Sequence, residues 1–574
     1  MRYRLTLLLT IIIFSSSITW AQQDPMAEAL YLFENNRYEE AIERFNHIDT
    51  PLARLFIAKS WYALGDFRTS LRLSESISKS VSGVIASEAQ YLNALNHFQQ
   101  KNFGPALELL HTLKTDPDIS ISNESQQFYN ALLAYLSWNQ RMELVSKVRN
   151  SEIKTDIVTG YFERYHRDIA VQLVEQLRRY DRTSNHNDLL RSAQRLSNEV
   201  NLNFQATYPD GLIIDIGVLL PAFDNKPSDK SVSRGLYNGV LLAVDEFNRN
   251  NGNRKVRIHF IDSDKISGGL GSNITRLKQE LSLDVIIGPL YSEQVEQLSS
   301  VTERMGIPIL PPLANTFRLS ARNTMIYQIN PSFAARGRKT AQIAMENLGL
   351  NKFAVVSEKG THGEMDAKAF IEQIQSAGGT ISRYFNEDFA SNGYFVGDIT
   401  PWLANNQALV DSTVIVIDTV DAVYLPYTGE VAGTLLNLTL TGLEAYQPDY
   451  IILGNDEMMY IEHSGDRLRR LNLMYTTSSF LRESNQDAIN FRYDYVNRSG
   501  VDPSSFSYLG YDIGKYFLNA VDQLGNPDDF WIWYTSIQPF HGMATSIVLG
   551  EDRSNEALNL FRVSSNRFDQ IPLD

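Results

Sequence analysis

The chain has 574 residues, 43% of them hydrophobic and 21% charged, which is typical of folded globular proteins and, at roughly 150 residues per domain, predicts about three structural units. Acidic side chains outnumber basic ones by 67 to 52, so there is no basic excess to neutralise phosphates, which argues against a nucleic-acid-binding protein. The sequence contains no cysteine, which excludes disulfides, thiol nucleophiles, iron–sulfur clusters and cysteine-ligated zinc.

Residues 1–21 have the pattern of a secretory signal peptide. Arg2 and Arg4 precede an apolar run that ends at Ile18, and small residues stand at the positions that a signal peptidase reads before cleavage after Ala21. The alternative is an uncleaved membrane anchor, but the run falls short of the roughly 20 apolar residues that cross a bilayer. We therefore expect a periplasmic or exported protein that is soluble after cleavage and is not a lipoprotein anchored through cysteine.

Residues 22–200 are predicted to form an all-α domain of helical repeats. Glycine and proline are scarce there, and apolar residues recur at three- and four-residue spacing. One short phrase occurs three times, as Asn36-Arg37-Tyr38-x-x-Ala41-Ile42, Gly65-Asp66-Phe67-x-x-Ser70-Leu71 and Lys101-Asn102-Phe103-x-x-Ala106-Leu107. The aromatic residue is expected to close a turn between antiparallel helices, and the small residue to let them pack closely. Longer helices are expected afterwards at 128–139 and 158–180.

These phrases resemble tetratricopeptide repeats, although their spacing is less even than the period of about 34 residues of that family. The resemblance implies stacked helical hairpins with a concave groove that binds a protein partner. A helical spacer that covers one end of the next domain is the alternative interpretation.

From residue 212 onward the pattern changes to short apolar strands that alternate with helices. Strands are expected at 213–221, 256–261, 284–287 and 307–310, with helices at 233–248, 273–282 and 292–305. Strands separated in this way imply right-handed βαβ crossovers and a parallel sheet. A helix at 334–348 and a strand at 353–357 predict a second sheet of the same kind. Ligands of such sheets bind beyond the carboxyl ends of the strands, where helix N-termini present free N–H groups.

The order of several phrases in this part resembles the type I periplasmic binding proteins, particularly the branched-chain amino-acid (Leu/Ile/Val) binding family. The phrases are Ile216-Gly217-Val218-Leu219-Leu220-Pro221, Gly235-x-x-x-Gly239-x-x-x-Ala243, Val285-Ile286-Ile287-Gly288-Pro289-Leu290-Tyr291-Ser292, Gly306-Ile307-Pro308-Ile309 and Tyr508-x-x-Tyr511-Asp512. The resemblance implies an α/β fold class for residues 212–574, with two Rossmann-like lobes joined by a hinge. The first lobe would take 212–331 and 476–524, and the second 332–455 and the C-terminal tail.

The resemblance also implies a ligand site shared by the two lobes. In amino-acid-binding relatives a hydroxyl and backbone N–H groups hold the ligand carboxylate, and Ser292 falls at that position. An acid in the second lobe holds the ammonium, and Asp456 falls there. Serine is also a common helix N-cap, and an aspartate in a loop is often simply solvated, so each residue keeps a structural alternative.

Four further residues fall at positions that line the ligand site in this family. Asn315 stands where a small hydroxyl residue is common, and His362 and Thr428 stand where amino-acid binders often carry aromatic rings. The loss of both rings argues against a branched-chain ligand. Tyr291 and neighbouring tyrosines would restore aromatic surface, or would serve as packing.

No motif of metalloproteases, P-loop enzymes or serine hydrolases is present, so we expect a non-enzymatic protein without cofactor or metal. The leading hypothesis is an exported receptor that closes two lobes over a small polar ligand, such as an amino acid or a derivative, for transport through a permease. The alternative follows from domain order, which is similar to that of penicillin-binding-protein activators: an envelope module that binds cell-wall synthases and regulates peptidoglycan synthesis. Those activators are lipid-anchored through cysteine, which this chain lacks.

Overall fold

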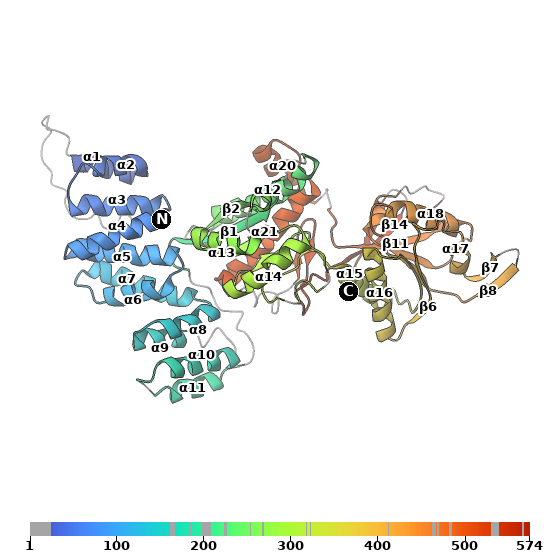
Figure 1. Ribbon diagram of the computed structural model, residues 1–574, viewed down its shortest axis with the longest axis horizontal. Helices are drawn as coiled ribbons and strands as arrows, with labels where there is room; N and C mark the ends of the chain where they lie inside the picture. Colours follow the sequence, from blue (N-terminus) through green and yellow to red (C-terminus); the bar gives the residue numbers. More distant parts are fainter. Residues whose placement is uncertain are drawn as a thin grey trace.

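The computed structural model has three bodies along its long axis, a helical arm and two α/β lobes (Figure 1). It describes residues 25–160, 167–183, 185–197, 208–222, 227–252, 254–266, 269–316, 318–321, 323–410, 413–446, 448–461, 467, 470–481, 485–529, 539–564 and 567–573. The predicted signal peptide, 1–21, lies outside the described residues. Within them, no helix combines the length and the apolar character that crossing a membrane requires.

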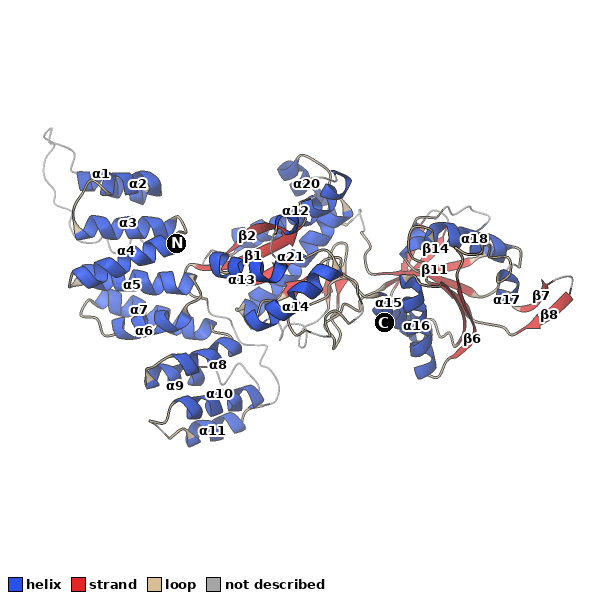
Figure 2. Cartoon of the chain, viewed as in Figure 1, coloured by secondary structure: helices blue, strands red, loops and turns tan. Residues whose placement is uncertain are grey.

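In its described residues the arm consists of helices, most of which pack against the next helix along the chain (Figure 2). They are α1 (Pro25–Glu34), α2 (Tyr38–Phe45), α3 (Pro51–Ala63), α4 (Phe67–Ser80), α5 (Val84–Gln99), α6 (Phe103–Leu113), α7 (Ile119–Tyr135), α8 (Trp138–Lys147), α9 (Ser151–Thr159), α10 (Arg167–Tyr180) and α11 (Asn187–Gln194). The arm ends before the first strand of the first lobe, so the all-α domain precedes the α/β part as predicted.

Each repeated sequence phrase forms the same turn. Its first residue adopts a left-handed backbone with φ of 58°, 86° and 60° at Asn36, Gly65 and Lys101 respectively. Its aromatic residue is the first residue of the following helix, α2, α4 or α6. Its small residue is fully buried at Ala41, Ser70 and Ala106. The phrase therefore encodes a tight helix–turn–helix with close packing of its second helix.

The helix expected at 128–139 is wrong in its bounds. Helix α7 ends at Tyr135, and Ser137 begins the next helix instead of continuing the first. The Ser137 hydroxyl accepts from the backbone N–H of Gln140, and the Gln140 side chain accepts from the N–H of Ser137. This reciprocal cap satisfies two of the otherwise unpaired N–H groups of α8, which favours a break over a longer helix.

Lobe 1 is a parallel sheet of order β2-β1-β3-β4 between helices. Its elements are β1 (Leu212–Leu220), α12 (Pro227–Asn250), β2 (Arg254–Asp262), α13 (Leu270–Leu281), β3 (Val285–Ile287), α14 (Ser292–Met305) and β4 (Ile309–Leu310). After an excursion into lobe 2 the chain returns with α20 (Gln486–Ser499) and α21 (Ser505–Leu524), which pack on α12.

Glycines let α12 and α21 approach closely. A Cβ atom on Gly239 would lie 2.1 Å from the carbonyl oxygen of Ser507, and one on Gly510 would lie 2.2 Å from that of Leu236. Any side chain at either position would therefore push the helices apart. The glycine spacing seen in the sequence is thus a helix-packing device.

Lobe 2 is a sheet of order β15-β14-β11-β10-β9-β5-β6, parallel except for β14 and β15. Its elements are α15 (Phe333–Gln342), β5 (Lys352–Glu358), α16 (His362–Ser376), β6 (Thr380–Glu387), α17 (Thr400–Leu403), β9 (Ala422–Leu425), α18 (Ala432–Glu444), β10 (Ile451–Gly454), β11 (Asn472–Thr477), β14 (Asn559–Ser564) and β15 (Arg567–Ile571), with a separate hairpin of β7 (Asn406–Val410) and β8 (Thr413–Ile417). Together the two lobes confirm the predicted fold class, two α/β lobes behind an all-α domain.

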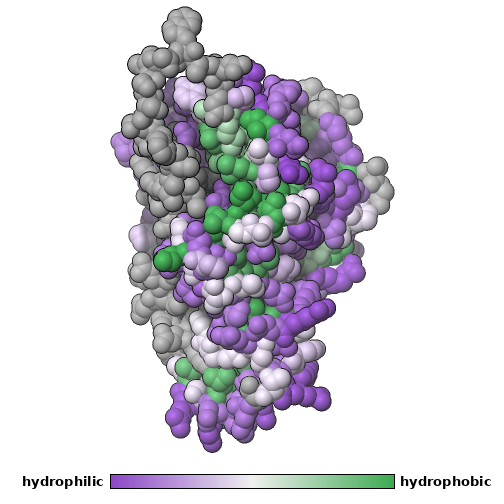
Figure 3. Space-filling view, turned by 90° about the vertical axis from the view of Figure 1, so that its left-hand side faces the viewer, coloured by the Kyte–Doolittle hydropathy of each residue, from purple (hydrophilic) through white to green (hydrophobic). Residues whose placement is uncertain are grey.

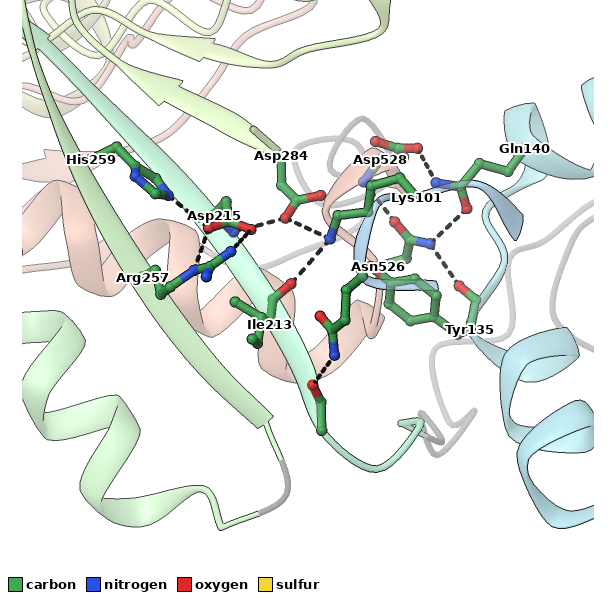
Figure 4. A network of polar contacts seen from close by, with 12 residues as sticks. Lys101, Tyr135, Gln140, Ile213, Asp215, Arg257, His259, Asp284, Asn526 and Asp528 are labelled. Carbon is green, nitrogen blue, oxygen red and sulfur yellow. Dashed lines mark hydrogen bonds and ion pairs between the residues drawn. The ribbon is translucent and has the colours of Figure 1, made fainter. Parts of the chain in front are cut away.

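The arm docks on lobe 1 through a polar network at the amino-terminal edge of the sheet (Figure 4). Lys101 Nζ donates to the carbonyl oxygen of Ile213 (3.0 Å) and pairs with Asp284 Oδ2 (3.1 Å). Asp284 also accepts from the backbone N–H of Asp215 (2.8 Å). Burial raises the pKa of Asp284, and the positive charge of Lys101 opposes this shift.

A second contact lies where α21 ends. Asn526 Nδ2 donates to the carbonyl oxygen of Tyr135 (2.6 Å), and Gln140 Nε2 donates to Asp528 Oδ2 (2.5 Å). The buried apolar side chains around both contacts form one cluster that runs from the arm into lobe 1 and includes Leu132 and Val218. The arm and lobe 1 therefore share a core.

Replacing Lys101 with Met keeps the apolar stem and removes the partner of a buried carboxylate. We expect Lys101→Met to lower the free energy of unfolding by about 3 kcal/mol, because Asp284 is left buried without its cation. Denaturant titration followed by circular dichroism measures this. Lys79→Met, which removes an exposed pair with Glu75, is the matched control and should cost nothing measurable. Equal stability of the two variants would contradict the expectation.

Candidate ligand-binding site

The carboxyl-terminal edge of the lobe 1 sheet places two of the predicted residues at the start of α14. Strand β3 ends at Ile287, and a Cβ atom on Gly288 would lie 2.1 Å from the carbonyl oxygen of Leu219 on β1, so the loop can pass there only with glycine. The loop then reaches Tyr291, which is 54% exposed, and Ser292. The helix begins at Ser292, with Tyr291 in the N-cap position and no side-chain cap.

Ser292 does not act as an N-cap. Its hydroxyl accepts from the backbone N–H of Thr316 (3.3 Å) in the loop after β4, and so ties two loops of lobe 1 together. Asn315 precedes that N–H group and is partly buried. The structure therefore brings Tyr291, Ser292 and Asn315 to one edge, beside the uncapped N–H groups of α14, which can hold a carboxylate.

The lobe 2 residues meet at the corresponding edge of the second sheet. His362 is the first residue of α16 and is exposed, and its ring stacks on that of Phe333, the first residue of α15 (4.6 Å between centroids, 3° between planes). Thr428 is buried, and its hydroxyl accepts from the backbone N–H of Gly363 (2.8 Å). Thr428 therefore holds the start of α16 in place.

Asp456 follows β10 at the same edge and has a basic neighbour. Its carboxylate lies 3.6 Å from Arg336 Nη1, and the Asp456 side chain remains 38% exposed. Asn455, the preceding residue, donates through its side chain to the carbonyl oxygen of Tyr427 (2.7 Å) and fixes the loop. The Asp456 carboxylate therefore has a basic neighbour and is still partly open to solvent.

The chain passes between the lobes from β4 to α15 (the first crossing), from β11 to α20 (the middle crossing) and from α21 to β14 (the last crossing). The first crossing links both edges. Asn330 donates through Nδ2 to the carbonyl oxygen of Leu313 in lobe 1 (2.9 Å) and accepts at Oδ1 from Arg336 Nη2 in lobe 2 (3.1 Å). No direct bond between Ser292 and Asp456 is found in the described part of the chain. The residues predicted to bind a ligand therefore lie in two groups, one on each lobe, which flank this crossing and are called the candidate half-sites below.

Sequence reasoning missed Arg336, Phe333 and Asp366. Phe333 and Arg336 stand three residues apart, just after the Ser332 cap of α15, and this spacing at a lobe boundary is the signal that could have found them. Asp366 is buried and accepts from the Tyr424 hydroxyl (2.6 Å). Burial raises the pKa of Asp366 to about 7, and the positive charge of Arg336 opposes this shift.

The neighbouring tyrosines of lobe 2 are packing residues. Tyr424 and Tyr427 are buried, and the Tyr427 hydroxyl lies 3.1 Å from the Thr439 hydroxyl. Tyr291 alone among the three tyrosines considered lies at the surface. No group of three or more histidine, aspartate or glutamate side chains is arranged to hold a metal ion within the described ranges.

Comparison with known proteins identifies the family of the α/β part of the chain. A family model described as periplasmic binding protein matches residues 214–530, which is more than half of the chain. The chain therefore belongs to the periplasmic binding protein family. A sequence search of the curated proteins found no match.

Several solved structures are similar to the α/β part of the chain. An ABC transporter substrate-binding protein from Sphaerobacter thermophilus is 17% identical with a TM-score of 0.45, covering 63% of this chain and 97% of its own. A leucine binding protein from Thermotoga maritima is 18% identical with a TM-score of 0.39, covering 62% and 98%. A branched-chain amino acid transporter substrate binding protein from Streptococcus pneumoniae, in complex with isoleucine, is 15% identical with a TM-score of 0.39, covering 62% and 99%. Similarities this low do not indicate the ligand of this chain.

The raised pKa of Asp366 makes lobe 2 sensitive to pH. The folded state favours the protonated carboxyl, so its contribution to stability is complete below about pH 4 and is lost as the pH rises to about 7. We expect Asp366→Asn to remove this loss, so that the melting temperature of the variant gains on that of the wild type between pH 4 and 7. Scanning calorimetry at several pH values measures it, with the exposed Asp418→Asn as control. Parallel pH profiles of wild type and Asp366→Asn would refute it.

Proposed function

We propose that this protein is an exported, non-enzymatic receptor that closes its two lobes over a small polar ligand, such as an amino acid or a derivative, for transport through a permease. Membership of the periplasmic binding protein family supports this proposal. The observation that carries it is the pair of half-sites at the carboxyl ends of both sheets, with Ser292 on one and Asp456 on the other. Binding of one ligand by both would favour the closed arrangement.

The chemistry of the two half-sites suits a zwitterion. The N–H groups at the start of α14 and the Ser292 hydroxyl would hold a carboxylate, because the helix dipole and uncapped donors act together there. Asp456 would hold an ammonium group. Asn315, Tyr291 and His362 would line the space between them, while Thr428 would act by positioning His362 through Gly363.

We expect Ser292→Ala and Asp456→Asn each to weaken binding of the proposed ligand by roughly 10- to 100-fold, the effect of one hydrogen bond to a charged group. Isothermal titration of the full chain against a panel of amino acids and small amides measures it. Ser300→Ala, an exposed change on the same helix α14, is the control and should bind as the wild type does. A well-folded wild type that binds no member of the panel would refute the receptor.

The arm would bind a protein partner, whether the two lobes act as a transport receptor or as a regulatory module. Its helices lie in the helical-repeat domain predicted from the sequence, residues 22–200. They resemble tetratricopeptide repeats and would bind a permease or another envelope protein. The outer face of the arm carries apolar patches among polar surface (Figure 3). Exposed apolar side chains described in the arm include Tyr31, Leu52, Leu64, Val84 and Ile119.

The second candidate function is an envelope module that regulates peptidoglycan synthesis, as in penicillin-binding-protein activators. The arm in front of the lobes favours it, because a solute receptor needs only the two lobes. Crosslinking in the native envelope discriminates the two candidates. We expect a permease among the captured proteins if the receptor proposal holds, and recovery of cell-wall synthases instead would favour the module.

A further inference from the structure

Arg336 places a positive charge, fixed by neighbouring groups, at the lobe 2 half-site. The residue lies one turn into α15, and its side chain is 16% exposed. The guanidinium lies 5.4 Å from the centroid of the Phe333 ring, and Nη2 donates to Asn330 Oδ1 (3.1 Å). These two contacts therefore hold the guanidinium before any ligand binds.

One donor of this guanidinium is unused. Arg336 Nε is buried and has no hydrogen-bond partner within the described part of the chain, and the 3.6 Å from Nη1 to Asp456 exceeds a hydrogen bond. Buried donors in folded proteins almost always have an acceptor, so an orphaned one at a ligand site indicates an acceptor that the ligand supplies. A carboxylate is the acceptor that matches the guanidinium fork, because it can take two parallel N–H donors.

Neither of the nearby acids, Asp456 and Asp366, accepts a hydrogen bond from Arg336 Nε. The Asp456 carboxylate remains 38% exposed and is available to a second cation. Asp366 is buried and accepts from the Tyr424 hydroxyl, as described above. Lobe 2 thus offers one negative and one positive group side by side, while lobe 1 offers a place for a carboxylate at the start of α14.

We propose that the ligand is an amino acid with an acidic side chain, whose second carboxylate binds the Arg336 guanidinium. The inference rests on the proposed function, in which the α-carboxylate binds lobe 1 and the ammonium binds Asp456. An aliphatic side chain would leave Arg336 Nε unpaired, as it is without ligand, and would therefore gain no hydrogen bond there. The site would also offer an aliphatic side chain little apolar surface, because the Thr428 hydroxyl is bonded to the Gly363 N–H and the His362 ring is stacked on Phe333.

The test is isothermal titration of the full chain with L-glutamate and L-aspartate against their neutral amides, L-glutamine and L-asparagine, and against L-leucine. We expect at least one acidic amino acid to bind roughly 10- to 100-fold more tightly than its amide and than leucine. Arg336→Gln should abolish this preference by weakening the acidic ligand while leaving the amide unchanged, and Arg336→Lys should keep part of it. Arg338→Gln, which removes the same charge two residues away on α15, should keep it in full.

The outcomes separate the two proposals. Binding of glutamine, asparagine or leucine as tightly as the acidic amino acids, or equal preference in Arg336→Gln and Arg338→Gln, overturns the acidic-ligand inference and leaves the receptor intact. Absence of binding by every amino acid, with wild-type circular dichroism, overturns the receptor and this inference with it.

Discussion

The connection between the two lobes depends on hydrogen bonds among the crossing segments, and one buried side chain makes several of them. Asn555 is completely buried, and its amide donates to the carbonyl oxygens of Ile329 and Ser546 (both 2.9 Å) while accepting from the N–H groups of Val548 and Ala557 (2.9 and 3.0 Å). Backbone groups that are not paired in a ladder need another partner, and a side chain can supply it. The Asn555 amide, together with the backbone hydrogen bonds of Gln328 with Arg553 and Asn555, thereby joins the first and the last crossing.

Hydrogen bonds that start from lobe 1 connect the last crossing to the middle crossing. Asp512 on α21 is buried and accepts from the backbone N–H groups of Met543, Ala544 and Thr545. Burial raises the pKa of Asp512 to about 6, although the three N–H groups act in the opposite direction. The Thr545 hydroxyl then donates to the carbonyl oxygen of Ser478 in the middle crossing (3.1 Å). Because lobe 1 shares a core with the arm, closure of the proposed receptor is expected to move lobe 2 against the rest.

Features that follow from apolar periodicity or glycine spacing could be predicted from the sequence. Features that depend on tertiary contacts could not. Alternating strands and helices gave both lobes, and the repeated phrase marked turns whose left-handed residues the structure shows. Ser292 and Asp456 were placed at the correct ends of their strands. The break at Ser137 was missed because helix periodicity continues across it and only the cap decides. Arg336 was missed because its partners, Asn330 and Asp456, lie on other elements: its spacing from Phe333 marks the start of α15 but does not reveal those contacts.

The pairing of Arg336 with Asp456 fits the proposed receptor, which would have to remain open without ligand. Two isolated charges at a partly buried edge would each lose hydration without compensation, whereas a loose pair keeps both at modest cost. At 3.6 Å the pair is weak enough to be separated, since neither group gives up a direct hydrogen bond to the other. A ligand that brings an ammonium and a carboxylate replaces one long contact by two shorter ones. Under the proposed function this gain would arise only when the ligand carries both charges, so the pair that stabilises the empty edge would also discriminate among ligands.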